Sequence, residues 1–368
     1  MLQTVLPLEP LEPLESLESL VREAKDGLSF DRTISRRLVH RASVTEVFLT
    51  DAVVAGADRF LIGAQLPRNH ALYRPEETGQ CDFMLLVETV RQAGIYLSHR
   101  HYDVPLGHHF IFKALSLHIT DPAALRVGAG PLAVVLDVNV ATPGGRTATT
   151  PGGRAAAGMP GGAVTGAMTG AIPGAMTGAV SGPTPGAVIG ARNPRRFDAR
   201  FDMVIEVGGR ECARASAGVT VIDGVRYARL RQRGRTTGTV PARPSAYETK
   251  GGAPGDARGV LRPAPGTAVR QAGTGEWRLH VDPTHPGYFE HPSDHVPGML
   301  LLEAFRQAAL ELGGGTVLAA LEAEFAVFGE LGETVTVQAA ATTAGDGRMR
   351  LSATQGGRVL ATAGARRA

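Results

Sequence analysis

The chain has 368 residues, which is long enough for two domains that each bury a core of their own. Its formal net charge is only +3, and the sequence has no ladder of basic and aromatic residues that would stack on bases, so a nucleic-acid partner is not expected. No uninterrupted apolar run reaches membrane-spanning length, and the first residues carry Glu where a signal peptide would carry Lys or Arg, so we expect a cytoplasmic protein without membrane association.

The N-terminal region is expected to pass from a mobile tail into ordered structure. Residues 6–20 repeat Leu, Glu and Pro or Ser in triplets, and proline forbids a continuous helix in the first half of this run. We therefore predict a mobile tail over residues 1–37 that closes with a short helix before Gly27. Two β-rich runs follow, Ser43–Thr50 and Arg59–Leu66, with a turn between them.

A helix is expected over residues 82–101, with Asp82 placed to cap its N-terminus. Strands are then predicted over 110–119 and 132–140. From 141 to 196 the composition collapses to Gly, Ala, Pro, Thr and Met. Such a segment has little with which to offset its ordering entropy, so it is predicted to be a disordered insert within a domain.

Strand-like sequence resumes at 201–207 and continues through 216–231, and a Pro/Gly/Arg-rich linker is expected over 232–275. After this linker the earlier order of elements returns. A strand is predicted over 277–281 and a helix over 297–312. Four further strands are expected over residues 320–328, 334–341, 349–354 and 359–363.

One helix followed by a set of antiparallel strands thus occurs twice, which predicts an α+β protein made of two similar domains. The expected boundaries are a tail over 1–37, a first repeat over 38–231 that contains the insert 141–196, a linker over 232–275, and a second repeat over 276–368.

The internal repeat is clearest in the two helices. Met84–Ala93 aligns with Met299–Ala308 without a gap, and seven of the ten positions are identical. Both helices are apolar on nearly every side, so each is expected to be wrapped by a sheet. The polar residues of each helix lie at i, i+3 and i+4 and so form one stripe along its surface. They are Glu88, Arg91 and Gln92 in the first helix, and Glu303, Arg306 and Gln307 in the second.

Burying such a stripe costs several kcal/mol unless the charges are paired or face a cleft. One interpretation is a structural Glu–Arg pair that locks the helix in place. The other is a functional site. The two are compatible if one repeat is structural and the other catalytic.

The stretch 289–304 resembles the active-site region of 3-hydroxyacyl-ACP dehydratases, which are hot-dog enzymes. The shared features are a histidine, then Pro-Gly, then Glu-Ala on the central helix. The resemblance places Glu303 where that family has its catalytic acid. His291 and His295 are both candidates for the histidine.

The whole chain is most similar to the A-factor biosynthesis (AfsA) family. The segments that carry this resemblance are residues 38–51, 60–70, 84–93, 104–110 and 282–309. It implies a tandem double hot-dog fold, in which each repeat is a central helix wrapped by an antiparallel sheet. It also implies γ-butyrolactone synthesis, in which a β-ketoacyl group moves from acyl carrier protein to the hydroxyl of dihydroxyacetone phosphate. The carrier's phosphopantetheine thioester is then a substrate, and no cofactor is expected. Because two hot-dog repeats are fused in one chain, we expect the protein to be either a monomer or a homodimer.

Acyl transfer to an alcohol needs a base, donors for the oxyanion and an oriented acceptor. We expect Glu303 or one of the histidines to act as the base, and backbone N–H groups near Gly298 and Met299 to polarise the thioester carbonyl. Arg306 is expected to bind the acceptor's phosphate or to hold Glu303.

Further candidates come from the first repeat and from the second motif. Glu88 and Arg91 occupy the equivalent places in the first repeat, so Glu88 is a catalytic candidate and Arg91 a candidate substrate contact. Gln307 and Asp294 are also candidate substrate contacts, although helix capping alone would explain Asp294. His70 and His285 align with each other, and both can cap turns. No metal-ligand spacing is present, so no metal is expected.

Two other functions remain open. A hot-dog dehydratase or thioesterase would release water or free acid from the acyl carrier protein. A non-catalytic double hot-dog protein would only bind an acyl ligand.

Overall fold

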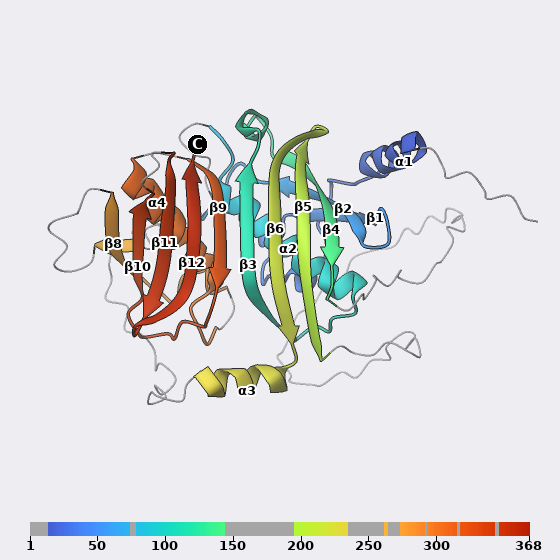
Figure 1. The fold of residues 1–368 in the computed structure, drawn as a ribbon. Coiled ribbons are helices and arrows are strands. Elements are labelled where there is room, and N and C mark those ends of the chain that lie inside the picture. Colours follow the sequence, from blue (N-terminus) through green and yellow to red (C-terminus); the bar gives the residue numbers. More distant parts are fainter. Residues whose placement is uncertain are drawn as a thin grey trace, which may run out of the picture.

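The computed structural model describes residues 14–73, 79–143, 195–234, 261–263, 273–290, 293–314, 317–342 and 346–368. A single antiparallel sheet of twelve strands forms the front layer in Figure 1, and the helices α2 (Phe83–His101) and α4 (Gly298–Gly313) lie behind it. The strands are β1 (Leu49–Val54), β2 (Arg59–Leu66), β3 (His109–Ile119), β4 (Leu132–Ala141), β5 (Arg196–Val207), β6 (Arg210–Ile222), β7 (Leu261–Pro263), β8 (Thr274–Leu279), β9 (Leu318–Phe325), β10 (Thr336–Ala341), β11 (Arg348–Gln355) and β12 (Arg358–Arg367).

The strand order has a mirror plan about its centre. It runs β1-β2-β4-β5-β6-β3 through the first half and β9-β12-β11-β10-β8-β7 through the second. In each half the strand that follows the helix lies innermost, so β3 and β9 pair with each other and join the halves. Leu115 pairs with Ala323 and Leu117 with Leu321, and these residues turn their side chains to the buried face. The sheet is therefore continuous across both repeats.

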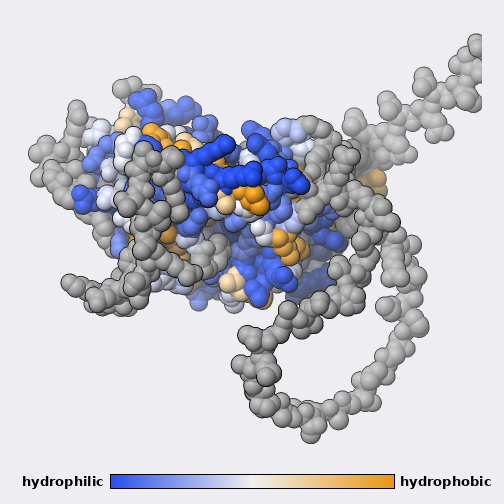
Figure 2. All heavy atoms as spheres, turned by 90° about the horizontal axis from the view of Figure 1, so that it is seen from below, coloured by the Kyte–Doolittle hydropathy of each residue, from blue (hydrophilic) through white to orange (hydrophobic). Residues whose placement is uncertain are grey.

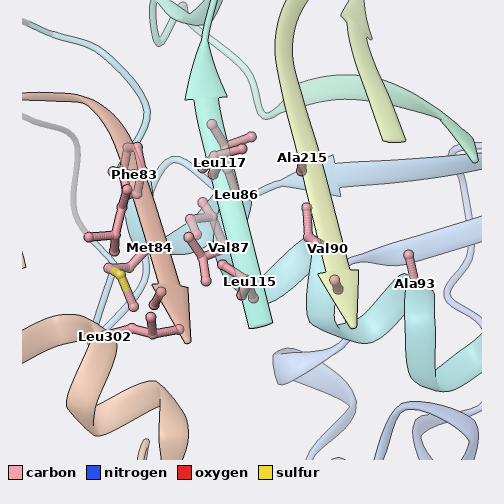
Figure 3. Close-up of a cluster of buried hydrophobic side chains, with 14 of the residues drawn as sticks. Phe83, Met84, Leu86, Val87, Val90, Ala93, Leu115, Leu117, Ala215 and Leu302 are labelled. Atoms are coloured by element: carbon pink, nitrogen blue, oxygen red, sulfur yellow. The ribbon is translucent and has the colours of Figure 1, made fainter. Parts of the chain in front are cut away.

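The two helices are buried because the sheet curves around them. Nearly every residue of α2 is buried, as expected for a helix that is apolar on almost all sides. Figure 3 shows the part of the core where side chains of α2, such as Met84 and Val87, gather with Leu115 of β3 and Leu302 of α4. The helices predicted over 82–101 and 297–312 are confirmed. Asp82 caps α2 by accepting a hydrogen bond from the Met84 N–H at 2.8 Å.

Most of the predicted strands are also confirmed, but two predictions are wrong. The run 43–50 begins with a 3₁₀ turn (η2, Val44–Glu46), because the Ser43 side chain accepts the Thr45 N–H; the strand β1 starts only at Leu49. The run 216–231 is a strand only to Ile222. Asp223 then accepts the Arg226 N–H at 2.7 Å, and the helix α3 (Gly224–Gly234) begins.

Ordered packing begins earlier than the predicted tail allowed. The helix α1 (Leu14–Asp26) precedes Gly27, Leu28 is buried, and the Ile34 N–H donates to the Leu49 carbonyl at 3.1 Å. Two further 3₁₀ turns are η1 (Arg36–Val39) and η3 (Pro122–Leu125).

The two segments of biased composition fall at different places in the sheet. Most of the predicted insert, residues 144–194, lies outside the described residues. It connects β4 to β5, which are adjacent and antiparallel, so it leaves the ladder between them intact. The predicted linker contains β7, which pairs with β8 at the edge of the sheet.

Candidate active site

The polar stripe of the first helix forms a closed ion cluster rather than an open site. Glu88 is fully buried, and its carboxylate accepts hydrogen bonds from Arg91 (2.8 Å to each oxygen), Arg41 (3.1 Å) and Gln92 (2.8 Å). Arg41 also donates to Glu290 at 2.8 Å. Burial alone would favour the protonated acid, but the two guanidinium groups outweigh it and hold the pKa of Glu88 at about 2.

The second helix repeats the arrangement with fewer partners. The Arg306 guanidinium donates to both oxygens of Glu303 at 2.7 Å, and Gln307 donates to the same carboxylate at 2.7 Å. Glu303 and Arg306 are 3% and 6% exposed. A bidentate pair that is this well covered leaves Glu303 with little access to a substrate.

The glutamines show what the stripe does in the fold. The Gln92 side-chain oxygen accepts the Phe48 N–H at 3.0 Å, just before β1. The Gln307 oxygen accepts the Leu261 N–H at 3.3 Å, at the start of β7. Each stripe therefore ties its helix to the outermost strand of its own half. This geometry favours the structural interpretation in both repeats.

A cavity of about 320 Å³ lies beside the inner strands and is mostly apolar. It opens near α3, where Leu230, Arg231 and Arg233 lie on its wall, and it reaches the start of α4. Its other lining residues include Phe110, Ile111, Phe112, Val296, Leu301, Phe325, Val327 and Phe328. Its size and lining are suited to an acyl chain.

A second cavity, of about 240 Å³, lies between the halves; polar atoms make up a larger share of its wall than in the first cavity, and it is called the polar cavity below. Among the described residues its wall holds two arginines, four histidines and one carboxylate; because Glu88 and Glu290 pair with the two arginines, it offers hydrogen-bond donors to an anion without a net positive charge. These wall residues are Arg41, Arg91, His40, His108, His109, His295 and Glu290.

The two cavities share part of their walls. His295 and Gly298 line both, together with Phe110 and Phe112 of β3. Glu303 and Arg306 line neither of them. Of the residues predicted from the sequence, the structure therefore brings His295, Gly298, Met299 and Arg91 to the polar cavity and leaves the Glu303 pair behind it.

His295 is held by a carboxylate and a phenol. Its Nδ1 lies 2.8 Å from the Asp294 carboxylate and 3.2 Å from the Tyr227 hydroxyl, which itself donates to Asp294 at 2.6 Å. Because a carboxylate only accepts, Nδ1 carries the proton and Nε2 keeps a lone pair. Such a carboxylate-oriented imidazole is the usual form of a catalytic base.

Asp294 is not the N-cap of α4, and its carboxylate is engaged by His295, Tyr227 and Arg231. The N-cap of α4 is Pro297, and no side chain caps it. Partial burial raises the pKa of Asp294, but hydrogen bonds from His295 and Tyr227 and the charge of Arg231 outweigh it, so the pKa lies well below its usual value. Arg231 donates to Asp294 at 3.1 Å and to Glu330 at 2.7 Å.

Backbone donors also face the junction of the cavities. The N–H groups of Gly298 and Met299 open α4, where helix geometry provides no acceptor, and no bond to either is found within the described part of the chain. Both residues line the polar cavity. The first turn of α4 can therefore hold a developing negative charge beside His295.

Several site residues were missed at the level of sequence. Tyr227 and Arg231 lie on α3, where a strand was expected, and the His109 ring stacks on Tyr227 with the ring centroids 3.8 Å apart. The only sequence signal was Asp223 followed by glycine, which marks a helix start. His291 lies outside the described residues.

His70 and His285 have matching structural roles. The Nδ1 of His70 accepts the N–H groups of Leu72 and Tyr73, and the Nδ1 of His285 accepts those of Gly287 and Tyr288, all at 3.1–3.2 Å. Both histidines cap turns, as the repeat suggested.

Neither a metal-binding cluster nor a membrane-spanning helix is found among the described residues. No group of three or more His, Cys, Asp or Glu side chains there is arranged to hold a metal ion. No helix in that part of the chain is both long and apolar enough to cross a membrane.

The sequence matches the A-factor biosynthesis hotdog domain (AfsA) over residues 23–168 and 266–367. It is 30% identical over 319 residues to a 2-oxo-3-(phosphooxy)propyl 3-oxoalkanoate synthase of Streptomyces virginiae, and this alignment covers 85% of this chain and 89% of the relative. A protein of the same name from Streptomyces coelicolor is 29% identical over 301 residues, 80% of this chain and 78% of the relative. A solved structure of an oleoyl thioesterase (putative) from Lactobacillus plantarum aligns with 12% identity over 84% of this chain and 96% of that chain, with a TM-score of 0.43, a likeness too weak to inform on activity. The match over most of the ordered sequence shows that the chain belongs to the AfsA family of hot-dog domains.

Proposed function

We propose that the protein is an acyltransferase of γ-butyrolactone signal biosynthesis, which moves a β-ketoacyl group from acyl carrier protein to the hydroxyl of dihydroxyacetone phosphate. The observation that carries the proposal is the pair of cavities that share part of their walls, one mostly apolar and one lined by arginine and histidine side chains. The names of the two Streptomyces relatives describe a phosphorylated ester of a 3-oxoalkanoate, which is the product of such a transfer.

The acyl chain would lie in the apolar cavity, and the acceptor in the polar one. Arg91 lies on the polar wall with a side chain 12% exposed, and a guanidinium group suits a phosphate. The reacting carbon would then lie at the shared wall, next to His295 and Gly298.

His295 serves as the base in this scheme. Its Nε2 takes the proton of the acceptor hydroxyl as the oxygen attacks the thioester carbonyl, and the N–H groups of Gly298 and Met299 hold the oxyanion. Collapse breaks the carbon–sulfur bond, and the departing thiolate takes the proton back from His295. Asp294 keeps the imidazole oriented throughout. The transfer needs no cofactor other than the thioester substrate.

Glu303 and Arg306 act as positioning residues in this proposal, because Glu303 holds Gln307, whose side-chain oxygen accepts the Leu261 N–H of β7. Glu88 and Gln92 do the same for α2. The first repeat contributes Arg91 and the His109 region to the acceptor side.

The activity can be tested directly. The protein is incubated with β-ketoacyl carrier protein and dihydroxyacetone phosphate, and the phosphorylated β-ketoacyl ester is expected in the mass spectrum together with free carrier thiol. Omission of dihydroxyacetone phosphate should abolish both products, because no other acceptor is present.

Three different outcomes would contradict the proposal. Free β-keto acid released without dihydroxyacetone phosphate would indicate a thioesterase, and water lost from a 3-hydroxyacyl carrier protein would indicate a dehydratase. Tight binding of the acyl carrier protein with no product would indicate a non-catalytic binding protein.

Gly298→Ala tests whether the junction of the cavities is the reaction site. A Cβ there would meet the Phe325 ring at 3.5 Å, an ordinary contact, so the fold should accept it. The methyl group would nevertheless enter the wall shared by both cavities. We expect kcat/KM for ester formation to fall by about ten- to 100-fold with an unchanged Tm.

Gly364→Ala is the matched control, because a Cβ at that position of β12 meets nothing within 4 Å. Its kcat/KM should remain that of the wild type. Equal rates of ester formation in Gly298→Ala and Gly364→Ala would show that the reaction does not take place at the wall shared by the two cavities.

A further inference from the structure

The helix α3 carries an unusual concentration of positive charge. Its eleven residues include four arginines and no acidic residue. Arg231 is 5% exposed and turns inward to Asp294 and Glu330. Arg226, Arg229 and Arg233 are exposed. They stand at i, i+3 and i+7, so they form one stripe on the outer face, about 10 Å long.

This stripe lies at the mouth of the apolar cavity. In Figure 1 α3 crosses below the ends of the inner strands. Arg233 lines the cavity, and so do two further exposed cations from the other side of the mouth, Lys113 of β3 and Arg358 of β12. Apart from Glu330, which pairs with Arg231, the charged residues of the cavity wall are therefore cations contributed by both halves of the molecule.

Large apolar side chains are exposed at the same place. Val225 and Leu230 of α3 are 63% and 41% exposed, and Val327 at the mouth is 46% exposed. Val359 follows Arg358 and is 44% exposed. Figure 2, which looks at this side of the molecule, shows strongly hydrophilic and hydrophobic side chains next to one another. Arginine mixed with exposed apolar side chains is typical of a protein-binding surface.

We propose that the outer face of α3 is the docking surface for an acidic acyl carrier protein, whose thioester arm enters the apolar cavity between Arg233, Lys113 and Arg358. The surface is defined as Val225, Arg226, Arg229, Leu230 and Arg233. The inference rests on the proposed function only in naming the carrier as the source of the acyl group.

The charges and the geometry select this partner. A carrier protein must bring a long prosthetic arm to a cavity mouth while its own body rests on the surface outside. A stripe of three arginines flanked by valine and leucine matches an acidic helix with an apolar side. A nucleotide-bearing thioester such as a coenzyme A derivative could use the cations at the mouth, but it would leave Val225 and Arg226 without contact.

The test compares two acyl donors of different size. Arg226→Glu combined with Arg229→Glu should lower kcat/KM for the β-ketoacyl carrier protein by about tenfold or more, through KM, because like charges then face each other. Neither side chain lines the apolar cavity, so kcat/KM with the same acyl group on free pantetheine should stay within about twofold. Arg210→Glu combined with Arg214→Glu is the matched control at the opposite end of β6, and it should affect neither donor.

Direct binding separates this proposal from the activity. The acylated carrier protein should bind the wild type with an affinity that falls as salt rises, and the α3 variant should bind at least tenfold more weakly. Equal binding by the wild type and the α3 variant would overturn the docking proposal, and so would equal losses with both acyl donors. Salt-dependent binding that the α3 variant loses, without ester formation from either donor, would support the docking surface and overturn the acyltransferase proposal.

Discussion

His295→Asn is expected to lower kcat for ester formation by about 10²- to 10⁴-fold, the usual contribution of a positioned general base. The asparagine amide can still donate to Asp294 from the place of Nδ1, so the local hydrogen bonds survive. It has no basic nitrogen at the place of Nε2, so the acceptor hydroxyl keeps its proton. Single-turnover measurements of ester formation together with a thermal melt would separate the loss of chemistry from a loss of folding.

His118→Asn is the matched control for that experiment. His118 pairs with Glu322 on the exposed side of the sheet, away from both cavities. Its variant should retain wild-type turnover. A His295→Asn variant with full activity would leave His295 as a structural residue and move the search for the base to the other histidines of the polar cavity.

The fold was predictable where the sequence repeats itself. Met84–Ala93 and Met299–Ala308 carry the same apolar positions, and an apolar pattern on every side requires enclosure, so two helices wrapped by sheet followed from the residues alone. The inner pairing of β3 with β9 was not predictable in this way. Strand order depends on contacts between residues that are far apart in the sequence, and the local hydrophobic periodicity carries no information about those contacts.

The site was predictable only in part. Gly298, Met299 and His295 lie together on the wall of the polar cavity, because they belong to the same short motif. The role of Glu303 depends on the direction in which the polar stripe of α4 faces. The contact of this stripe with the outermost strand β7 fixes that direction, and the helix sequence alone does not. Tyr227 lies on α3, whose sequence was predicted to be a strand. That sequence gives little sign that the Tyr227 hydroxyl binds Asp294.

Glu88→Gln is expected to destabilise the protein by about 3–5 kcal/mol at neutral pH, since breaking a buried ion pair leaves charge without compensation. Arg41 and Arg91 have side chains only 8% and 12% exposed, and both bind Glu88. Glu303→Gln should cost less, because among the described residues a single arginine binds Glu303. Chemical denaturation monitored by circular dichroism gives both free energies of unfolding.

Glu211→Gln is the control, since Glu211 pairs with an Arg214 side chain that is 63% exposed. Exposed pairs contribute about 0–1 kcal/mol, so its effect should be small. A Glu88→Gln variant no less stable than Glu211→Gln would contradict the structural role of the first stripe.

The dependence on pH gives an independent check of the same ion cluster. The pKa of Glu88 is lowered from 4.5 to about 2 in the folded protein, so its stabilisation is complete above about pH 4.5 and disappears as the pH falls toward 2. A shift of this size corresponds to about 3 kcal/mol. Glutamine does not titrate, so the gap in unfolding free energy between the wild type and Glu88→Gln should narrow over this window. A gap that is equally wide at pH 7 and pH 3 would show that Glu88 stabilises the helix by packing rather than by its charge.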